Sequence, residues 1–107
     1  MAKRTKERSF ASAANTANML KAVADPDRLK IIASLRHGSK TVTDLAKILR
    51  SEIVNVSHHL GVLRRRKLVA HHKHGRFVHY TLNPDVYKVS DRGETLHLGG
   101  CKLEIAK

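Results

Sequence analysis

The stretch of this chain from Ile53 to Pro84 contains no aspartate or glutamate, yet it is rich in side chains that can bind an anion. Six of the eight histidines fall within it, together with the cations Arg64, Arg65, Arg66, Lys67, Lys73 and Arg76. Guanidinium, ammonium and imidazole groups at this density attract a polyanion and donate hydrogen bonds to phosphate oxygens. The segment therefore predicts a surface that binds nucleic acid.

The composition of the whole chain agrees with that chemistry and argues against other classes of protein. The 107 residues fit one domain, and 21 Lys and Arg against 9 Asp and Glu give a net charge of +12 on a chain that is 41% hydrophobic. The single cysteine, Cys101, cannot form an intrachain disulfide, and no apolar run is long enough to cross a membrane. We expect a cytoplasmic protein without a signal peptide. Because no nucleophile–base pair, phosphate-binding glycine loop or carboxylate pair is present, we expect no catalytic residues and no cofactor.

Two helices are expected before the basic stretch. Residues 9 to 24 carry apolar side chains at helical spacing behind Ser9 as a cap, and the stripe is mostly alanine, which suits close packing against a partner chain. Asp25-Pro26-Asp27 predicts the start of a second helix, because aspartate caps helices and proline fits their first position. This helix should end at His37-Gly38. Its expected core residues are Leu29, Ile32 and Leu35, with Ile31 beside them.

A short third helix from about Thr41 to Leu49 and a fourth ending near Lys67 are separated only by the tight turn 50–53. Two helices joined so closely are typical of the crossed helix-turn-helix. The expected buried residues are Val42, Leu45, Ile48 and Leu49 in the third helix, and Val56, Leu60 and Leu63 in the fourth.

After the fourth helix the apolar period changes to two, which predicts a β-hairpin with strands at 68–70 and 77–82. Residues 71–76 would form its polar, basic tip, within reach of a phosphate backbone. In the C-terminal tail, Gly99-Gly100 predicts a second hairpin with Leu98 opposite Cys101 and Leu96 opposite Leu103. An extended, loosely docked tail is the alternative there.

Helix, helix, helix-turn-helix and basic hairpin, in this order, predict a winged helix: a mainly α fold with a small antiparallel β-wing. Three segments resemble the ArsR/SmtB family of bacterial repressors: ADPDRLKII at 24–32, VSHHLGVL at 56–63 and GRFVHYTL at 75–82. The resemblance covers residues 18 to about 84 and implies a homodimer that binds an inverted repeat in double-stranded DNA, represses transcription and is released by an effector. We expect a basic N-terminal arm at 1–8, the DNA-binding domain at 9–84 and a C-terminal tail at 85–107.

The fourth helix is expected to enter the major groove by its N-terminal half. With Val56, Leu60 and Leu63 pointing inward, the opposite side of this helix is left for DNA. Of the neighbours His58 and His59, one should donate to phosphate while the other packs against the wing. The predicted DNA-binding residues are Val54, Asn55, Ser57, His58 and Arg64 on the helix, and Lys73, His74 and Arg76 on the wing.

The sensing residues that the resemblance implies are not matched. Thr41-Val42-Thr43 stands where the thiol-sensing branch has Cys-x-Cys, and Asp85-Val86-Tyr87 lacks the histidine of the C-terminal metal site. We therefore expect no metal site and DNA binding that is indifferent to arsenite and zinc. The effector, if one exists, stays unknown.

Two alternative functions remain open. The first is a metal- or redox-responsive regulator that uses His97 and Cys101, or the histidines of segment 71–74, where a metal would need a fourth ligand and compete with DNA. The second is a winged helix that binds RNA or another protein.

Overall fold

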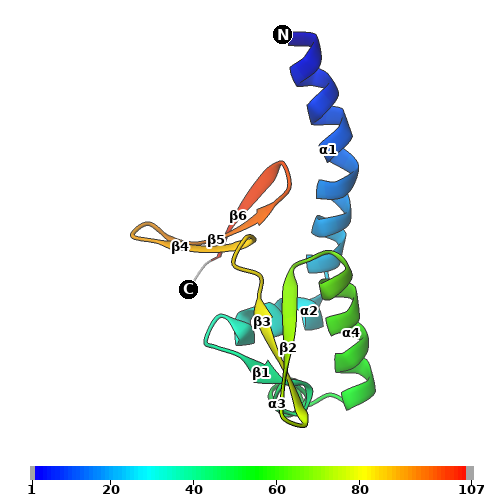
Figure 1. The fold of residues 1–107 in the computed structure, drawn as a ribbon, viewed down its shortest axis with the longest axis vertical. Helices are drawn as coiled ribbons and strands as arrows, with labels where there is room; N and C mark the ends of the chain where they lie inside the picture. The colour runs from blue at the N-terminus through cyan, green and yellow to red at the C-terminus, as the bar shows by residue number, and fades with distance from the viewer. Residues whose placement is uncertain (1, 106–107) are drawn as a thin grey trace.

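The computed structural model describes the backbone of residues 2–105 and the side chains of residues 12–105. Figure 1 shows a body of helices with a projecting hairpin below, and a second small sheet beside the first helix. The chain measures 51 × 31 × 27 Å along its principal axes. The elements run in the order α1 (Ala2–Val23), α2 (Pro26–Leu35), β1 (Lys40–Thr41), α3 (Val42–Leu49), α4 (Ile53–Arg65), β2 (Val69–His74), β3 (Phe77–Leu82), β4 (Tyr87–Ser90), β5 (Gly93–Leu98) and β6 (Cys101–Ile105).

The first helix is longer than expected, because it begins at Ala2 rather than at Ser9. Residues 2–8 contain neither glycine nor proline, so nothing in them interrupts the helix. The described part of the alanine stripe is not part of the chain's own core: Ala13, Ala14 and Ala17 are exposed, and the buried residues among the described side chains of α1 lie in its last turns. The buried residues there are Met19, Ala22 and Val23.

The buried residues of α2 and α3 recur at helical spacing, counted from the residue that caps each helix. Asp25 caps α2 as expected, and the inward positions of α2 are 28, 31, 32 and 35, so Leu29 is 51% exposed instead of buried. Thr41 and Asp44 form a capping box at α3, whose inward side contains Leu45 and Ala46 and leaves Ile48 52% exposed. The expectations for Leu29 and Ile48 were therefore wrong, because each side chain lies about a quarter turn away from the face that its helix buries.

The wing is a three-stranded sheet in the order β1-β3-β2. The short strand β1, which was not expected, pairs Thr41 with His79. Strand β2 continues to His74, so the polar segment 71–74 lies within the strand and only Gly75-Arg76 forms the turn. The long basic loop expected at 71–76 is thus corrected to a two-residue turn in which Gly75 has φ 65°.

The C-terminal residues form a second sheet in the order β4-β5-β6. The Gly99-Gly100 turn and the predicted pairs Leu98–Cys101 and Leu96–Leu103 are confirmed, whereas the pairing of β4 with β5 was not foreseen. The backbone N–H of Gly100 donates to the Thr16 hydroxyl at 2.8 Å, which attaches this hairpin to α1. On the side of α2, Arg36 forms an ion pair with Glu94, and the Tyr87 hydroxyl donates to the same carboxylate.

Gly99 makes this attachment sensitive to a single methyl group. A Cβ built at Gly99 would lie 2.4 Å from Thr16 Oγ1, and its φ of 63° is unfavourable for other residues by about 1–2 kcal/mol. Gly99→Ala should lower the free energy of unfolding by at least that amount and raise hydrogen exchange in β5 and β6. Gly100→Ala, whose Cβ would meet Thr16 Oγ1 only at 3.6 Å, is the matched control. Equal stability of the two variants would contradict the close approach.

Candidate nucleic-acid interface

Helix α4 presents one fully buried side and one exposed side. Val56, Leu60 and Leu63 have no exposed surface, as the sequence predicted. The residues between them face outward: Val54 is 75% exposed, and Asn55, Ser57 and His58 are exposed as well. Of the predicted helix residues, all except Arg64 are therefore brought together on one surface, toward the N-terminal end of α4.

The turn between α3 and α4 presents this end of α4 to solvent. Arg50 adopts a left-handed conformation with φ 53° and ends α3, and the Ser51 N–H donates back to the Ala46 carbonyl at 3.0 Å. Glu52 makes no side-chain hydrogen bond to the first turn of α4, which contains no acidic residue. That turn consequently combines free N–H donors with the positive end of the helix dipole, a combination that favours phosphate.

His59 lies on a different side of α4 from His58. Its Nε2 is 3.6 Å from Asp27 Oδ2, and its Nδ1 is 3.2 Å from the guanidinium of Arg28. The expectation that one of the two histidines packs against the wing was wrong: His59 packs against the start of α2. The helical period explains this contact, because His59 follows Val56 by three residues and borders the buried side.

Arg28 joins three helices at this point, and the sequence analysis did not single it out. Its Nε donates to the Ala22 carbonyl at 2.5 Å and its second terminal nitrogen to the Lys21 carbonyl at 3.4 Å, both in the last turn of α1. The available signal was its position three residues before Ile31, on the inward side of α2. Hydrogen bonds from the backbone N–H groups of Arg28 and Asp27 to Asp25 hold the pKa of that carboxyl below its usual value.

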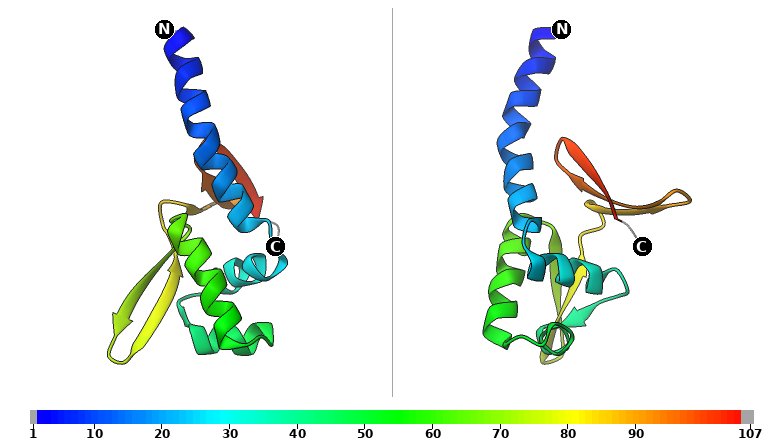
Figure 2. Two further views of the ribbon diagram at one scale, coloured as in Figure 1. Left: turned by 90° about the vertical axis from the view of Figure 1, so that its right-hand side faces the viewer. Right: turned by 180° about the vertical axis from the view of Figure 1, so that it is seen from behind.

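The wing carries the second group of predicted residues. Lys73, His74 and Arg76 are exposed around its end, and Figure 2 shows the hairpin projecting away from the helices. Arg64 does not belong to the exposed side of the α4 N-terminus. It donates to His71 Nε2 at 2.8 Å, and the His71 ring stacks on Tyr80 at 5.7 Å, so Arg64 connects α4 to the base of the wing.

The exposed aromatic ring of Phe77, 58% accessible, also lies at the end of the wing. The sequence analysis treated Phe77 only as a strand residue. Its position directly after Arg76 was the signal that it would be exposed beside the turn.

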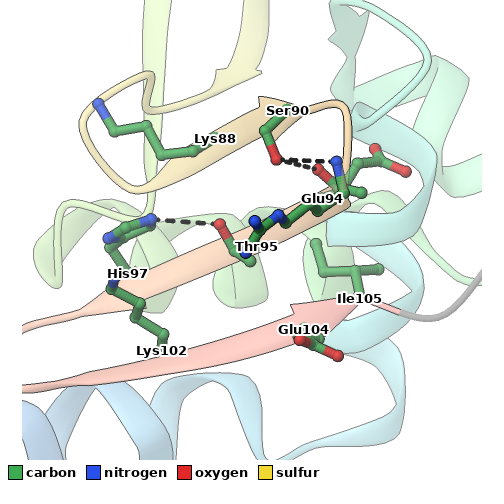
Figure 3. A pocket seen from close by; sticks show the side chains of 10 residues that line it. Lys88, Ser90, Glu94, Thr95, His97, Lys102, Glu104 and Ile105 are labelled. Atoms are coloured by element: carbon green, nitrogen blue, oxygen red, sulfur yellow. Dashed lines mark hydrogen bonds between the residues drawn. The ribbon is translucent and has the colours of Figure 1, made fainter.

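The polar side of the C-terminal sheet has a different character. A hollow of about 480 Å³ opens on this side of the sheet. His97 is hydrogen-bonded to Thr95 at 3.2 Å, Lys102 lies beside His97, and Glu104 lies farther along the same strand (Figure 3). The mixture of cations and carboxylates does not suit a phosphate backbone. On the neighbouring strands β5 and β6, His97 pairs with Lys102 and Leu98 pairs with Cys101. Because successive residues of a strand point to opposite sides of the sheet, His97 and Cys101 lie on opposite sides. These two residues, considered above as metal ligands, therefore cannot bind one ion within a chain.

Taken together, the helix-turn-helix, the exposed side of α4 and the basic hairpin define a winged helix-turn-helix protein. No helix in the part of the chain that the structure describes is long and apolar enough to cross a membrane.

Comparison with known proteins identifies the family. Residues 25–70 match the model of bacterial regulatory proteins of the arsR family. The chain is 36% identical to the transcriptional repressor SdpR of Bacillus subtilis (strain 168) across 68% of this chain and 81% of that protein. It is 42% identical to the HTH-type transcriptional regulator NmtR of Mycobacterium tuberculosis across 82% and 78% of the two chains.

Solved structures agree with these relatives. Reduced HlyU from Vibrio cholerae N16961 superposes with a TM-score of 0.66 at 33% identity, covering 70% of this chain and 79% of its own. A homodimeric winged helix-turn-helix DNA-binding domain from Mycobacterium bovis gives a TM-score of 0.69 at 26% identity, covering 73% and 72%. The chain belongs to the ArsR family of bacterial transcriptional regulators.

The lowered pKa of Asp25, which caps α2, predicts how acid affects the stability of the fold. A carboxyl whose folded-state pKa lies below its unfolded value stabilises the fold above the unfolded value of about 3.9, and this contribution is lost as the pH falls through the folded value. Asp25→Asn keeps a capping side chain but cannot titrate. The variant should therefore lose less stability than the original chain between pH 5 and acid unfolding, measured by urea unfolding at a series of pH values.

Asp85→Asn, at an exposed aspartate outside the helices, is the control and should leave that acid dependence unchanged. An acid dependence of Asp25→Asn identical to that of the original chain would contradict the role given to Asp25.

Proposed function

We propose that this protein is a homodimeric repressor that binds an inverted repeat in double-stranded DNA through α4 and the wing. The observation that carries the proposal is the exposed side of α4, where Asn55, Ser57 and His58 lie together on a segment without a single carboxylate from residue 53 to 84. A polar helix surface of this kind, without a carboxylate of its own, fits the major groove.

Each residue of α4 has a distinct role in this proposal. Asn55 binds the N6 and N7 edge of an adenine, and Ser57 bonds a base edge or a phosphate. Val54, the most exposed of the apolar side chains on α4, contacts a thymine methyl group. His58 donates to phosphate, and the open first turn of α4 accepts a phosphate at its N–H groups.

The wing supplies contacts that do not depend on sequence. Lys73, His74 and Arg76 reach the phosphates or the minor groove next to the site occupied by α4. Arg64 has a mixed role, because its guanidinium also orients His71 at the base of the hairpin.

The dimer forms through α1. Its N-terminal half extends past the rest of the chain (Figure 1), and Ala13, Ala14 and Ala17 leave a stripe without bulky side chains on which a second helix can pack closely. The Mycobacterium bovis relative is described as a homodimer. We propose the functional divisions 1–8, 9–84 and 85–107 for the basic N-terminal arm, the DNA-binding domain and the C-terminal tail.

Repression is supported by the names of relatives, among them SdpR and the arsenical resistance operon repressor of Escherichia coli (strain K12). We assign no catalytic role to the chain and place it in the cytoplasm, where its DNA is. Binding to RNA is the competing function, and parallel titrations with duplex DNA, duplex RNA and single strands distinguish the two.

Substitutions should separate the two groups of contacts. Asn55→Ala should weaken binding to the preferred duplex by about 1–3 kcal/mol and relax the choice of base at one position. Arg76→Ala should weaken binding to all duplexes alike and reduce the slope of log affinity against log salt by about one unit. Fluorescence anisotropy with preferred and scrambled duplexes at several salt concentrations measures both effects. An unchanged base preference in Asn55→Ala would refute the proposed placement of α4.

A charge on the alanine stripe should disrupt the dimer. Ala17→Glu places a carboxylate on each side of the proposed helix pair, where burial without a partner is unfavourable. Sedimentation should then show a monomer where the original chain sediments as a dimer. Val89→Glu, at an exposed position on β4, controls for the added charge. A monomeric original chain, both free and on DNA, would contradict the proposal.

A further inference from the structure

The register of the wing hairpin gathers three imidazoles on one side of the sheet. His72 pairs directly with His79, and His74 follows His72 by two residues, so all three side chains lie on the same side. Side chains directly opposite each other on neighbouring strands have Cβ atoms about 4.5–5.5 Å apart. Rotation about the side-chain bonds of these histidines can then bring one nitrogen from each ring to a single ion.

The three histidines surround a shallow hollow of about 410 Å³, and Ser39 and Lys73 complete its lining. The rings of His74 and His79 approach edge to face, with centroids 6.2 Å apart. None of the described residues that line this hollow is acidic. Because His72 and His74 are exposed, a change of rotamer can turn their nitrogens toward His79 without displacing core side chains.

Three imidazole nitrogens favour one class of metal ion over another. Imidazole nitrogen suits zinc, nickel, cobalt and copper, whereas magnesium and calcium require oxygen ligands. Three histidines with water in the fourth position form a complete tetrahedral zinc site, so no fourth protein ligand is needed. The objection raised by the sequence alone, that segment 71–74 lacks a ligand, is met by His79 on the neighbouring strand together with water.

A second group of possible ligands lies at the start of α2 but is already engaged. The ligand atoms of Asp25, Asp27 and His59 all lie within 4.8 Å of one another. The Asp25 carboxylate, however, accepts two backbone N–H groups, and the Arg28 guanidinium lies 3.2 Å from His59 Nδ1. A divalent cation there would face this fixed positive charge and displace existing hydrogen bonds.

We propose that the wing binds one divalent ion of the zinc, nickel and cobalt class through His72, His74 and His79. This proposal replaces the expectation from sequence that the chain has no metal site. That expectation did not consider His79, since the pairing of strands was required to place it. Protons compete with the ion for the imidazole nitrogens, so acidification should weaken metal binding.

The ion would also act on DNA binding, a consequence that depends on the proposed function. The bound ion replaces His74 as a phosphate contact, and it adds two positive charges to the hairpin that carries Lys73 and Arg76, to which phosphate is attracted. We expect zinc to strengthen binding to every duplex, provided that the three histidines are intact.

The first experiment uses the full chain without DNA, so its result is independent of the DNA-binding proposal. Titration with zinc by calorimetry, and with cobalt by visible absorption, should show one ion per chain and a tetrahedral cobalt spectrum. His72→Asn and His79→Asn should each weaken binding at least about tenfold. His71→Asn, on the opposite side of the same strand, and His59→Asn are matched controls that should bind normally. Circular dichroism verifies that each variant is folded.

If His71→Asn weakened zinc binding equally, the binding would be adventitious binding to surface histidines. If His59→Asn abolished zinc binding, the ion would lie at the start of α2. Either result would overturn the proposal. The second experiment repeats the duplex titrations with and without zinc. Higher affinity that disappears in His79→Asn is expected. Lower or unchanged affinity would overturn the coupling to DNA while leaving the metal site in place, and a failure to bind any duplex would instead refute the proposed function.

Discussion

The arrangement of the helices depends on the guanidinium of Arg28. It donates to the carbonyls of Ala22 and Lys21 at the end of α1 and to the ring of His59 on α4, and it lies next to the Asp25 cap of its own helix. One planar group with several donors in fixed directions thus relates α1 to α4. If α1 joins two copies and α4 binds DNA, as proposed, the distance between the two DNA-binding helices follows from this contact.

The buried side of α4 determines which side chains remain for DNA. Val56, Leu60 and Leu63 are completely enclosed, so α4 cannot rotate about its axis without exposing them, and Asn55 and Ser57 are held outward. The wing is oriented by a separate set of contacts, the hydrogen bond of Arg64 to His71 and the stacking of His71 on Tyr80. Because α4 is held by its buried side and the hairpin by its base, the proposed DNA contacts on α4 and those on the wing keep a fixed position relative to each other.

The sequence was sufficient for features that depend on local pattern. The spacing of Val56, Leu60 and Leu63 predicted the buried side of α4, and Gly99-Gly100 predicted the turn and pairing of β5 with β6. Features that depend on contacts between distant segments were not predictable in this way. The engagement of His59 by α2 and the pairing of His79 with His72 each require the relative placement of two elements.

The central claim, that a symmetric pair of α4 helices reads double-stranded DNA, is tested most directly by selecting bound duplexes from a random pool with the full chain and sequencing them. We expect enrichment of an inverted repeat whose half-sites are centred about 10–10.5 base pairs apart, or a multiple of that spacing. Enrichment of a site without two-fold symmetry, or no enrichment over the starting pool, would contradict it.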